Sequence, residues 1–131
     1  MSPKGTIRVW DENHLFFLDI ASPRTRANLT RNPWIELNIV DGLSRRGYRF
    51  LGTATLHAEG AVYDEACARI AADEGETYPA EAVVLIAVER AIPVVSPGYA
   101  HLPDEAAMRA MWRERRVGLE RAFEGHLESR A

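Results

Sequence analysis

The segment SPRTR carries the side chains that most readily suggest a chemical role. Ser22 is a good helix N-cap and Pro23 suits the first helical position, so this segment predicts a helix start. Such a start offers free backbone N–H groups and the positive end of the helix dipole. Arg24, Thr25 and Arg26 add side-chain donors that suit a phosphate. The alternative interpretation is that Ser22 only caps the helix and that the arginines are solvated.

Two further groups of polar residues accompany predicted strands. They are Ser2, Lys4 and Thr6 near the N-terminus, and Ser44, Arg45, Arg46 and Arg49 around the start of the strand YRFLGTATLH. The arginines of the second group are either edge-strand charges that discourage aggregation or ligands for an anion. Asp19 ends a strand just before SPRTR, and it is either a solvated turn residue or a group that orients a ligand.

Other chemistry-bearing patterns are weak. His14, His57, His101 and His126 are scattered without a second ligand at metal spacing, so we expect no metal site. The sequence contains no GxSxG, HExxH, P-loop or GxGxxG motif. Cys67 lies between alanines in a predicted helix, which favours a packed small residue over a nucleophile. No catalytic residue can be assigned from these patterns.

The composition is that of an ordinary globular protein. The chain has 131 residues, 47% hydrophobic and 27% charged, which suits a single domain over residues 1–131. A net charge of −3 favours neither nucleic acid nor an anionic membrane as a partner. The first residues do not resemble a signal peptide, and no segment approaches about 18 consecutive apolar residues. With a single cysteine, we expect a cytoplasmic protein.

The hydrophobic pattern predicts the element order β-β-α-β-β-α-β-α. The predicted strands are 6–10, 14–20, 34–40, 48–57 and 82–95, and the predicted helices are 23–30, 61–73 and about 103–125. Strands do not alternate regularly with crossover helices, so a doubly wound sheet is disfavoured. We expect a mainly β protein in which an antiparallel sheet, curled into a small barrel, is flanked by helices.

The ordered segments SPKGT, LDIASP, ANLTRNP and SRRGYRFLGTA closely resemble the pyridoxamine 5'-phosphate oxidase-like family of FMN-binding split barrels. VERAIPVVSPGY resembles the family's FMN-binding, oxidase-related subgroup, and the resemblance covers roughly residues 1–100. It implies an antiparallel split β-barrel and a homodimer with FMN at the subunit interface. Family members usually have a helix and a strand before SPKGT, so we expect the barrel edge to be open or closed by a partner chain.

The resemblance also implies which residues bind the cofactor. Lys4 falls where the family places a basic residue near the flavin phosphate, and Arg24 and Thr25 fall at the phosphate-binding pair. Thr25 replaces the usual lysine, and Gly47 replaces a glutamine that contacts the isoalloxazine ring. The remaining predicted cofactor-binding residues are Asp19, Ile20, Ala21 and Ser22 at the strand end, and Arg46, Tyr48 and Arg49 on the strand that contacts the flavin from the other subunit.

These features predict an FMN-dependent oxidoreductase that acts on an unidentified small organic substrate, with NAD(P)H as a candidate reductant. The substrate residues that the true oxidases carry at their C-terminus have no counterpart in this chain, so we do not expect oxidation of pyridoxamine phosphate itself. Two alternatives remain open. One is a split barrel that binds F420 or haem, and the other is a non-catalytic flavin-binding module.

Overall fold

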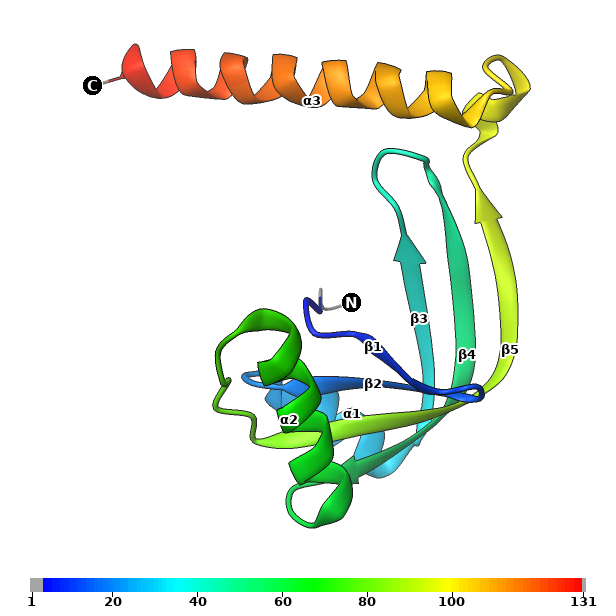
Figure 1. The fold of residues 1–131 in the computed structure, drawn as a ribbon, viewed down its shortest axis with the longest axis vertical. Coiled ribbons are helices and arrows are strands. Elements are labelled where there is room, and N and C mark those ends of the chain that lie inside the picture. The colour runs from blue at the N-terminus through cyan, green and yellow to red at the C-terminus, as the bar shows by residue number, and fades with distance from the viewer. Residues whose placement is uncertain (1–3, 131) are drawn as a thin grey trace. The chain divides into compact units, whose positions relative to one another are not determined.

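The computed structural model describes residues 4–130, and Figure 1 shows them as a ribbon. They separate into two compact units. Unit 1 comprises Met1–Leu37 and Phe50–Ala91, and unit 2 comprises Asn38–Arg49 and Ile92–Ala131. Three of the strands pass from one unit into the other. The single domain expected from the sequence stays a prediction.

The predicted order of strands and helices is confirmed. The elements are β1 (Arg8–Asp11), β2 (His14–Asp19), α1 (Pro23–Arg31), β3 (Trp34–Val40), β4 (Arg46–His57), α2 (Ala61–Glu74), β5 (Ala82–Val95), the 3₁₀ helix η1 (Pro97–Ala100) and α3 (Glu105–Glu128). The sequence pattern did not predict η1. No helix within the described residues is both long enough and apolar enough to cross a membrane.

The strands form one antiparallel sheet in the order β1-β2-β5-β4-β3. Strand β2 pairs with β5 in a regular register that places Phe16 opposite Leu85 and Leu18 opposite Val83. Within the described residues β1 and β3 are the two edges, and the sheet is not closed. Strand β4 lies inside the sheet, so the interpretation of its arginines as edge-strand charges is wrong.

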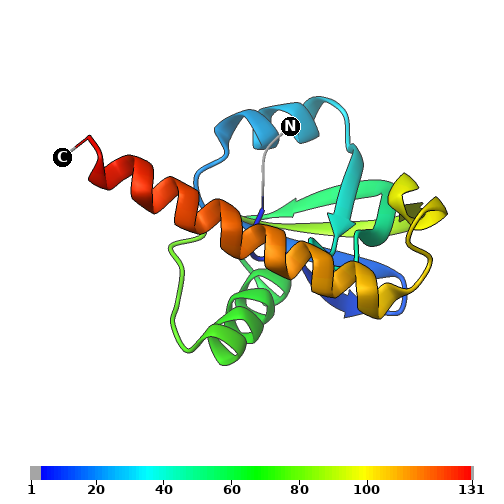
Figure 2. The ribbon, with the colours of Figure 1, turned by 90° about the horizontal axis from the view of Figure 1, so that it is seen from above.

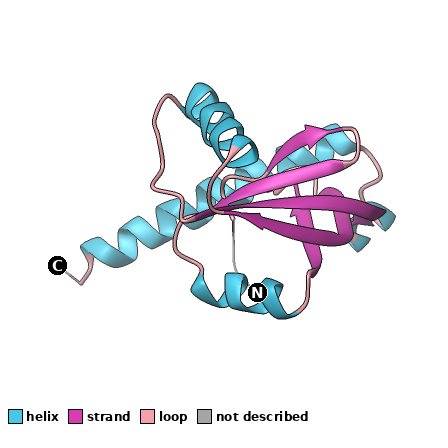
Figure 3. Cartoon of the chain, turned by 90° about the horizontal axis from the view of Figure 1, so that it is seen from below, coloured by secondary structure: helices cyan, strands magenta, loops and turns pink. Residues whose placement is uncertain are grey.

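Unit 1 contains two apolar clusters on opposite faces of the sheet. The first cluster is built around Phe17, and Leu29 brings α1 against it. The second is built around Phe16, and Ala66 and Ile70 bring α2 against it. Figures 2 and 3 show α1 and α2 on opposite sides of the strands. Successive side chains of a strand point to opposite faces, so covering both faces of the sheet buries nearly the whole of β2. The chain therefore enters α1 from a well-packed strand.

Unit 2 contains the β3–β4 turn, the end of β5, η1 and α3. Ser96 N donates to Arg45 O at 3.0 Å, and the Tyr99 hydroxyl donates to the carbonyl of Ser44. Arg45 itself has a φ of 57°, in the left-handed region that suits a turn. Among the described residues of unit 2, only Ser44 and Met108 are buried. The unit is therefore held by hydrogen bonds and stacked side chains and has almost no apolar core.

Candidate functional site

A groove of about 690 Å³ lies beside the start of α1 in unit 1. Its apolar lining includes the buried residues Phe17 and Leu29 together with Ile35 and Leu37 from β3. Its polar lining is Lys4, Ser22, Arg24, Thr25, Asn28 and Glu36. The volume lies within the usual range of small-molecule sites, which combine apolar walls with a few placed polar groups. The groove thus offers an apolar face for a ring and a cationic end for an anion.

Asp19 fixes the turn that leads from β2 into α1. Its carboxylate is fully buried and accepts a hydrogen bond from Ser22 N at 2.9 Å. Its other oxygen lies 2.8 Å from Arg26 Nε as an ion pair without hydrogen-bond geometry, and Arg26 also pairs with Glu81. The interpretation of Asp19 as a solvated turn residue is therefore wrong. Its role toward a cofactor stays a prediction, because Asp19 lines neither this groove nor the second one described below.

Ser22 occupies the N-cap position of α1 but does not cap the helix. Its hydroxyl accepts a hydrogen bond from Lys4 Nζ instead, so the capping interpretation is wrong. The first intrahelical hydrogen bond runs from Arg26 N to Ser22 O at 3.1 Å, and Pro23 has no N–H to satisfy. Within residues 4–130, no acceptor meets the N–H groups of Arg24 and Thr25. The positive end of α1 is therefore left open toward the groove.

Among residues 4–130, the side chains of Arg24 and Thr25 also have no partner. Within the described chain, neither the guanidinium nor the hydroxyl has a hydrogen bond or an ion pair. Lys4 adds a second cation, whose Nζ lies 5.4 Å from the centre of the Phe17 ring and bonds to Ser22 Oγ. Two cations, a hydroxyl and two backbone N–H groups together form a donor set suited to a phosphate.

A second groove of about 520 Å³ lies next to the first, and Ile20 lines only this second groove. The second groove shares Lys4, Ala21 and Ser22 with the first and is also lined by Glu74 and Tyr78. The Tyr78 hydroxyl donates to the Glu74 carboxylate, and this hydrogen bond, together with burial, raises the pKa of Tyr78 above its ordinary value. Tyr78 therefore keeps its proton throughout the neutral range.

The second predicted stretch, Arg46, Gly47, Tyr48 and Arg49, belongs to unit 2. The Arg46 guanidinium lies 4.3 Å from the centre of the Tyr99 ring and 3.7 Å from a carboxylate oxygen of Glu105. A Cβ on Gly47 would lie 1.9 Å from the carbonyl oxygen of Ile39, so the backbone admits only glycine there. Tyr48 is 50% exposed. Lys4, Ala21, Ser22, Arg24 and Thr25 are thus the predicted residues that the structure brings together in one groove.

Sequence reasoning missed several residues of the groove. Asn28 lies one helical turn after Arg24, so helical spacing could have identified it. Phe17 and Glu36 come from two different strands, and no local sequence signal links either of them to α1. Ser2, which lies near Lys4 in the sequence, is outside the described residues.

Histidines and acids do not assemble into a metal site in the described part of the chain. His14 Nδ1 lies 2.7 Å from Asp11 Oδ1, and His57 Nε2 lies 2.8 Å from Thr55 Oγ1. Neither histidine lines the groove beside α1. The ionisable side chains of that groove are Lys4, Arg24 and Glu36.

The family relationship follows from comparison with known sequences. A family model described as pyridoxamine 5'-phosphate oxidase matches residues 1–95, and these residues include the whole groove. The chain belongs to the pyridoxamine 5'-phosphate oxidase family. A search of the curated proteins found no match.

Solved structures of similar proteins share the fold. HupZ of Group A Streptococcus is 35% identical, with 72% of this chain and 74% of that chain covered at a TM-score of 0.64. A protein of Lactobacillus delbrueckii, provisionally named a pyridoxamine 5'-phosphate oxidase, is 25% identical, with 70% of each chain covered and a TM-score of 0.58. An FMN-binding protein of Syntrophomonas wolfei is 15% identical, with 69% of this chain and 64% of that chain covered and a TM-score of 0.54. The fold is an antiparallel split β-barrel with flanking helices, as predicted.

Proposed function

We propose that this member of the pyridoxamine 5'-phosphate oxidase family is an FMN-dependent oxidoreductase that binds the flavin phosphate at the start of α1. The observation that carries the proposal is the open helix start: the N–H groups and side chains of Arg24 and Thr25 have no partner within the described residues. The exposed Arg24 guanidinium beside uncapped N–H groups suits an anion, and the dipole of α1 favours a negative charge there.

The groove also fits the rest of FMN. Arg24, Thr25 and Lys4 would hold the phosphate, and the apolar lining around Phe17 and Leu29 would take the ring system. When bound, the flavin would supply hydride or electron transfer, while the chain supplies position and electrostatics. Since Thr25 replaces a lysine of the family pair, Lys4 becomes the second cation of the site.

The alternative cofactors fit this groove less well. F420 carries a long acidic tail, which would favour several arginines, whereas Arg24 is the one arginine among the described lining residues. Haem needs an axial ligand, commonly histidine, cysteine, methionine or tyrosine. None of these residue types lines the groove in the described chain. The composition of the lining therefore favours FMN.

The reaction that we propose is transfer of a hydride or of electrons from a reductant such as NAD(P)H to a small organic substrate. Family membership supports this reaction class. We further propose that the protein works as a homodimer in the cytoplasm. The concentration of exposed apolar side chains in unit 2 supports self-association, and the free thiol of Cys67 is compatible with a reducing compartment.

A titration with FMN, followed by flavin absorption and fluorescence quenching, tests the phosphate site. Arg24→Ala should weaken FMN binding by about 10- to 100-fold, because a charge-assisted hydrogen bond is worth about 1.5–3 kcal/mol. Arg31→Ala is the matched control, since Arg31 lies in the last turn of the same helix, and it should leave the affinity unchanged. Wild-type protein that does not bind FMN, or an Arg24→Ala variant that binds it normally, would contradict the proposal.

A further inference from the structure

The C-terminal part of α3 is exposed to solvent on all its sides. Every residue from Arg113 to Arg130 is exposed, including large apolar side chains. Leu119, Phe123 and Leu127 are 69%, 64% and 53% exposed. An amphipathic helix gains most of its stability by burying its apolar face, and long exposed apolar stripes usually mark an interaction surface.

Within its described residues, unit 2 has almost no apolar core that could compensate. All members of both apolar clusters belong to unit 1. Met108 is the one buried hydrophobic residue among the described residues of unit 2, and it lies at the start of α3. We therefore expect the part of α3 beyond Met108 to be stabilised by a surface that unit 2 does not itself provide.

The charges beside the stripe follow a self-complementary order. At about 100° of rotation per residue, Trp112, Leu119 and Phe123 lie along one line of α3, with Leu127 at its edge. One flank of this stripe carries Arg109, Arg113 and Arg116 first, and then Glu120 and Glu124. Arg116 Nε lies 3.1 Å from Glu120 Oε1, which places the boundary between the basic and the acidic part of the flank.

We propose that the exposed stripe of α3 pairs antiparallel with the same stripe of a second copy of this chain. A two-fold axis near residue 118 brings the same flank of both helices together. Arg113 then faces Glu124 of the second copy, and Arg116 faces Glu120. A parallel pair would instead set Arg116 against the opposite flank, which carries Arg115. The charge order therefore selects the antiparallel pair.

A cavity beside the stripe fits this arrangement. It has a volume of about 410 Å³ and is lined by Trp112, Arg116 and Leu119 of α3 and by the turn at residues 41–43. The three α3 residues are spaced like the sides of a hole in knobs-into-holes packing. The Arg45 guanidinium lies 4.2 Å from the centre of the ring of Trp112, one of the residues that line the cavity. In the antiparallel pair, Phe123 of the second copy lies opposite this cavity.

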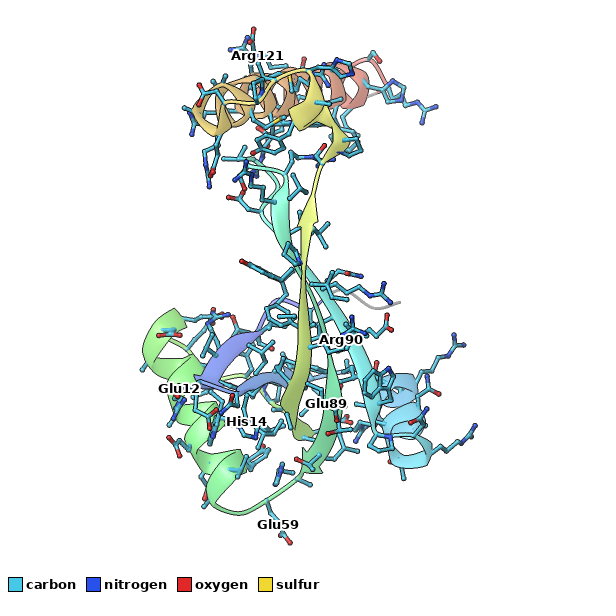
Figure 4. The ribbon with its side chains drawn as sticks, turned by 90° about the vertical axis from the view of Figure 1, so that its right-hand side faces the viewer. Glu12, His14, Glu59, Glu89, Arg90 and Arg121 are labelled. Atoms are coloured by element: carbon cyan, nitrogen blue, oxygen red, sulfur yellow. The ribbon has the colours of Figure 1, made fainter. Side chains whose placement is uncertain are left out.

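The pairing gives a surface to the homodimer of the proposed function, but it does not depend on FMN. It is tested without flavin by sedimentation velocity over a range of protein concentrations. Phe123→Glu should weaken dimerisation by about 100-fold or more, as expected for an apolar anchor. Figure 4 shows Arg121 projecting from the side of α3 that faces away from the rest of unit 2, so Arg121→Glu is the matched control and should not change the dimer.

Charge reversal and cross-linking test the orientation. Arg113→Glu and Glu124→Arg should each weaken the dimer by about fivefold, and the double variant should restore it because both pairs reform. In a Cys67→Ala background, Leu119→Cys should form a disulfide dimer. Leu127→Cys should not, because its counterpart would lie about 27 Å away along the helix.

A monomeric wild type would overturn the proposal and place the stripe against the protein's own chain. A dimer that tolerates Phe123→Glu would overturn it as well, since the dimer would then use another surface. Equal cross-linking at residues 119 and 127 would overturn the antiparallel orientation. If the dimer behaves as expected but FMN does not bind, the proposed cofactor fails while the helix pairing stands.

Discussion

The two helices α1 and α3 begin in opposite ways. At the start of α3, Asp104 accepts hydrogen bonds from Ala106 N at 3.2 Å and from Ala107 N at 3.3 Å, so its carboxylate closes the helix start. At the start of α1, the Ser22 hydroxyl is bonded to Lys4 and leaves the first N–H groups open. The difference supports the proposal that the start of α1 binds a ligand, whereas the start of α3 is closed by its own side chain.

The largest effect is expected at the residue that supports the open start. Asp19→Ala removes the acceptor of Ser22 N and leaves Arg26 without its buried partner. We expect a loss of about 2–3 kcal/mol in the free energy of unfolding, below the usual cost of breaking a buried pair because Arg26 is partly exposed. Urea denaturation measures it. A loss no larger than that of a surface substitution would show that Asp19 does not hold the turn.

Closing the start of α1 should abolish much of its affinity for an anion. Ser22→Asp gives α1 the type of cap that α3 has, and the new carboxylate competes with the flavin phosphate for Lys4 and the N–H groups. We expect FMN binding to weaken by about 30-fold without loss of thermal stability. Ser22→Ala is the neutral control and should weaken binding far less. An unchanged affinity of the Asp variant would remove the helix start from the site.

The converse change at α3 should affect stability alone. Asp104→Ala removes the acceptor of Ala106 N and Ala107 N, and loss of an N-cap typically costs about 1 kcal/mol. The free energy of unfolding should fall by about that amount, while the affinity for FMN stays at the wild-type value. A variant with weakened flavin binding would contradict the division of roles between the two helix starts.

The smallest effect is a pH dependence in the β3–β4 turn. The backbone N–H of Leu43 hydrogen-bonds the Asp41 carboxylate at 2.8 Å and is the main cause that lowers the pKa of Asp41 below 3.8. A carboxyl whose pKa is lowered by folding stabilises the fold above its unfolded pKa, and this contribution is lost as the pH falls through the folded pKa. Wild type should therefore melt at a higher temperature than Asp41→Asn at pH 6. This difference in melting temperature should disappear below the folded pKa of Asp41. A difference that stays constant with pH would contradict this account.

Most of the fold follows from local patterns in the sequence. The alternation of WIELNIV, the turn at Asp41-Gly42 and the apolar run of 82–95 predict β3, the hairpin and β5 with nearly the observed bounds. The sequence predicts a strand from Thr6 to Trp10, but β1 begins at Arg8 and ends at Asp11. Thr6 instead contacts β2 through its side chain, since its hydroxyl accepts a hydrogen bond from Leu18 N at 3.0 Å.

The site was only partly predictable because contacts with residues far away in the sequence determine the role of its side chains. Lys4 Nζ donates a hydrogen bond to the Ser22 hydroxyl, although the two residues are 18 positions apart in the sequence. N-capping rules consider only residues that are close in sequence. The buried Asp19 pairs with Arg26, which also pairs with the distant Glu81, and Arg46 stacks on Tyr99 from a separate segment. Local propensity describes which residues could cap or be solvated, and tertiary contacts decide which of them do.

The most direct test compares the affinity of the wild-type protein for FMN with its affinity for riboflavin, which lacks the phosphate. If the open start of α1 binds the phosphate, FMN should bind about 30-fold or more tightly than riboflavin, and raised salt should narrow this difference. Equal affinities for the two flavins at low salt would contradict the claim that the start of α1 is an anion site.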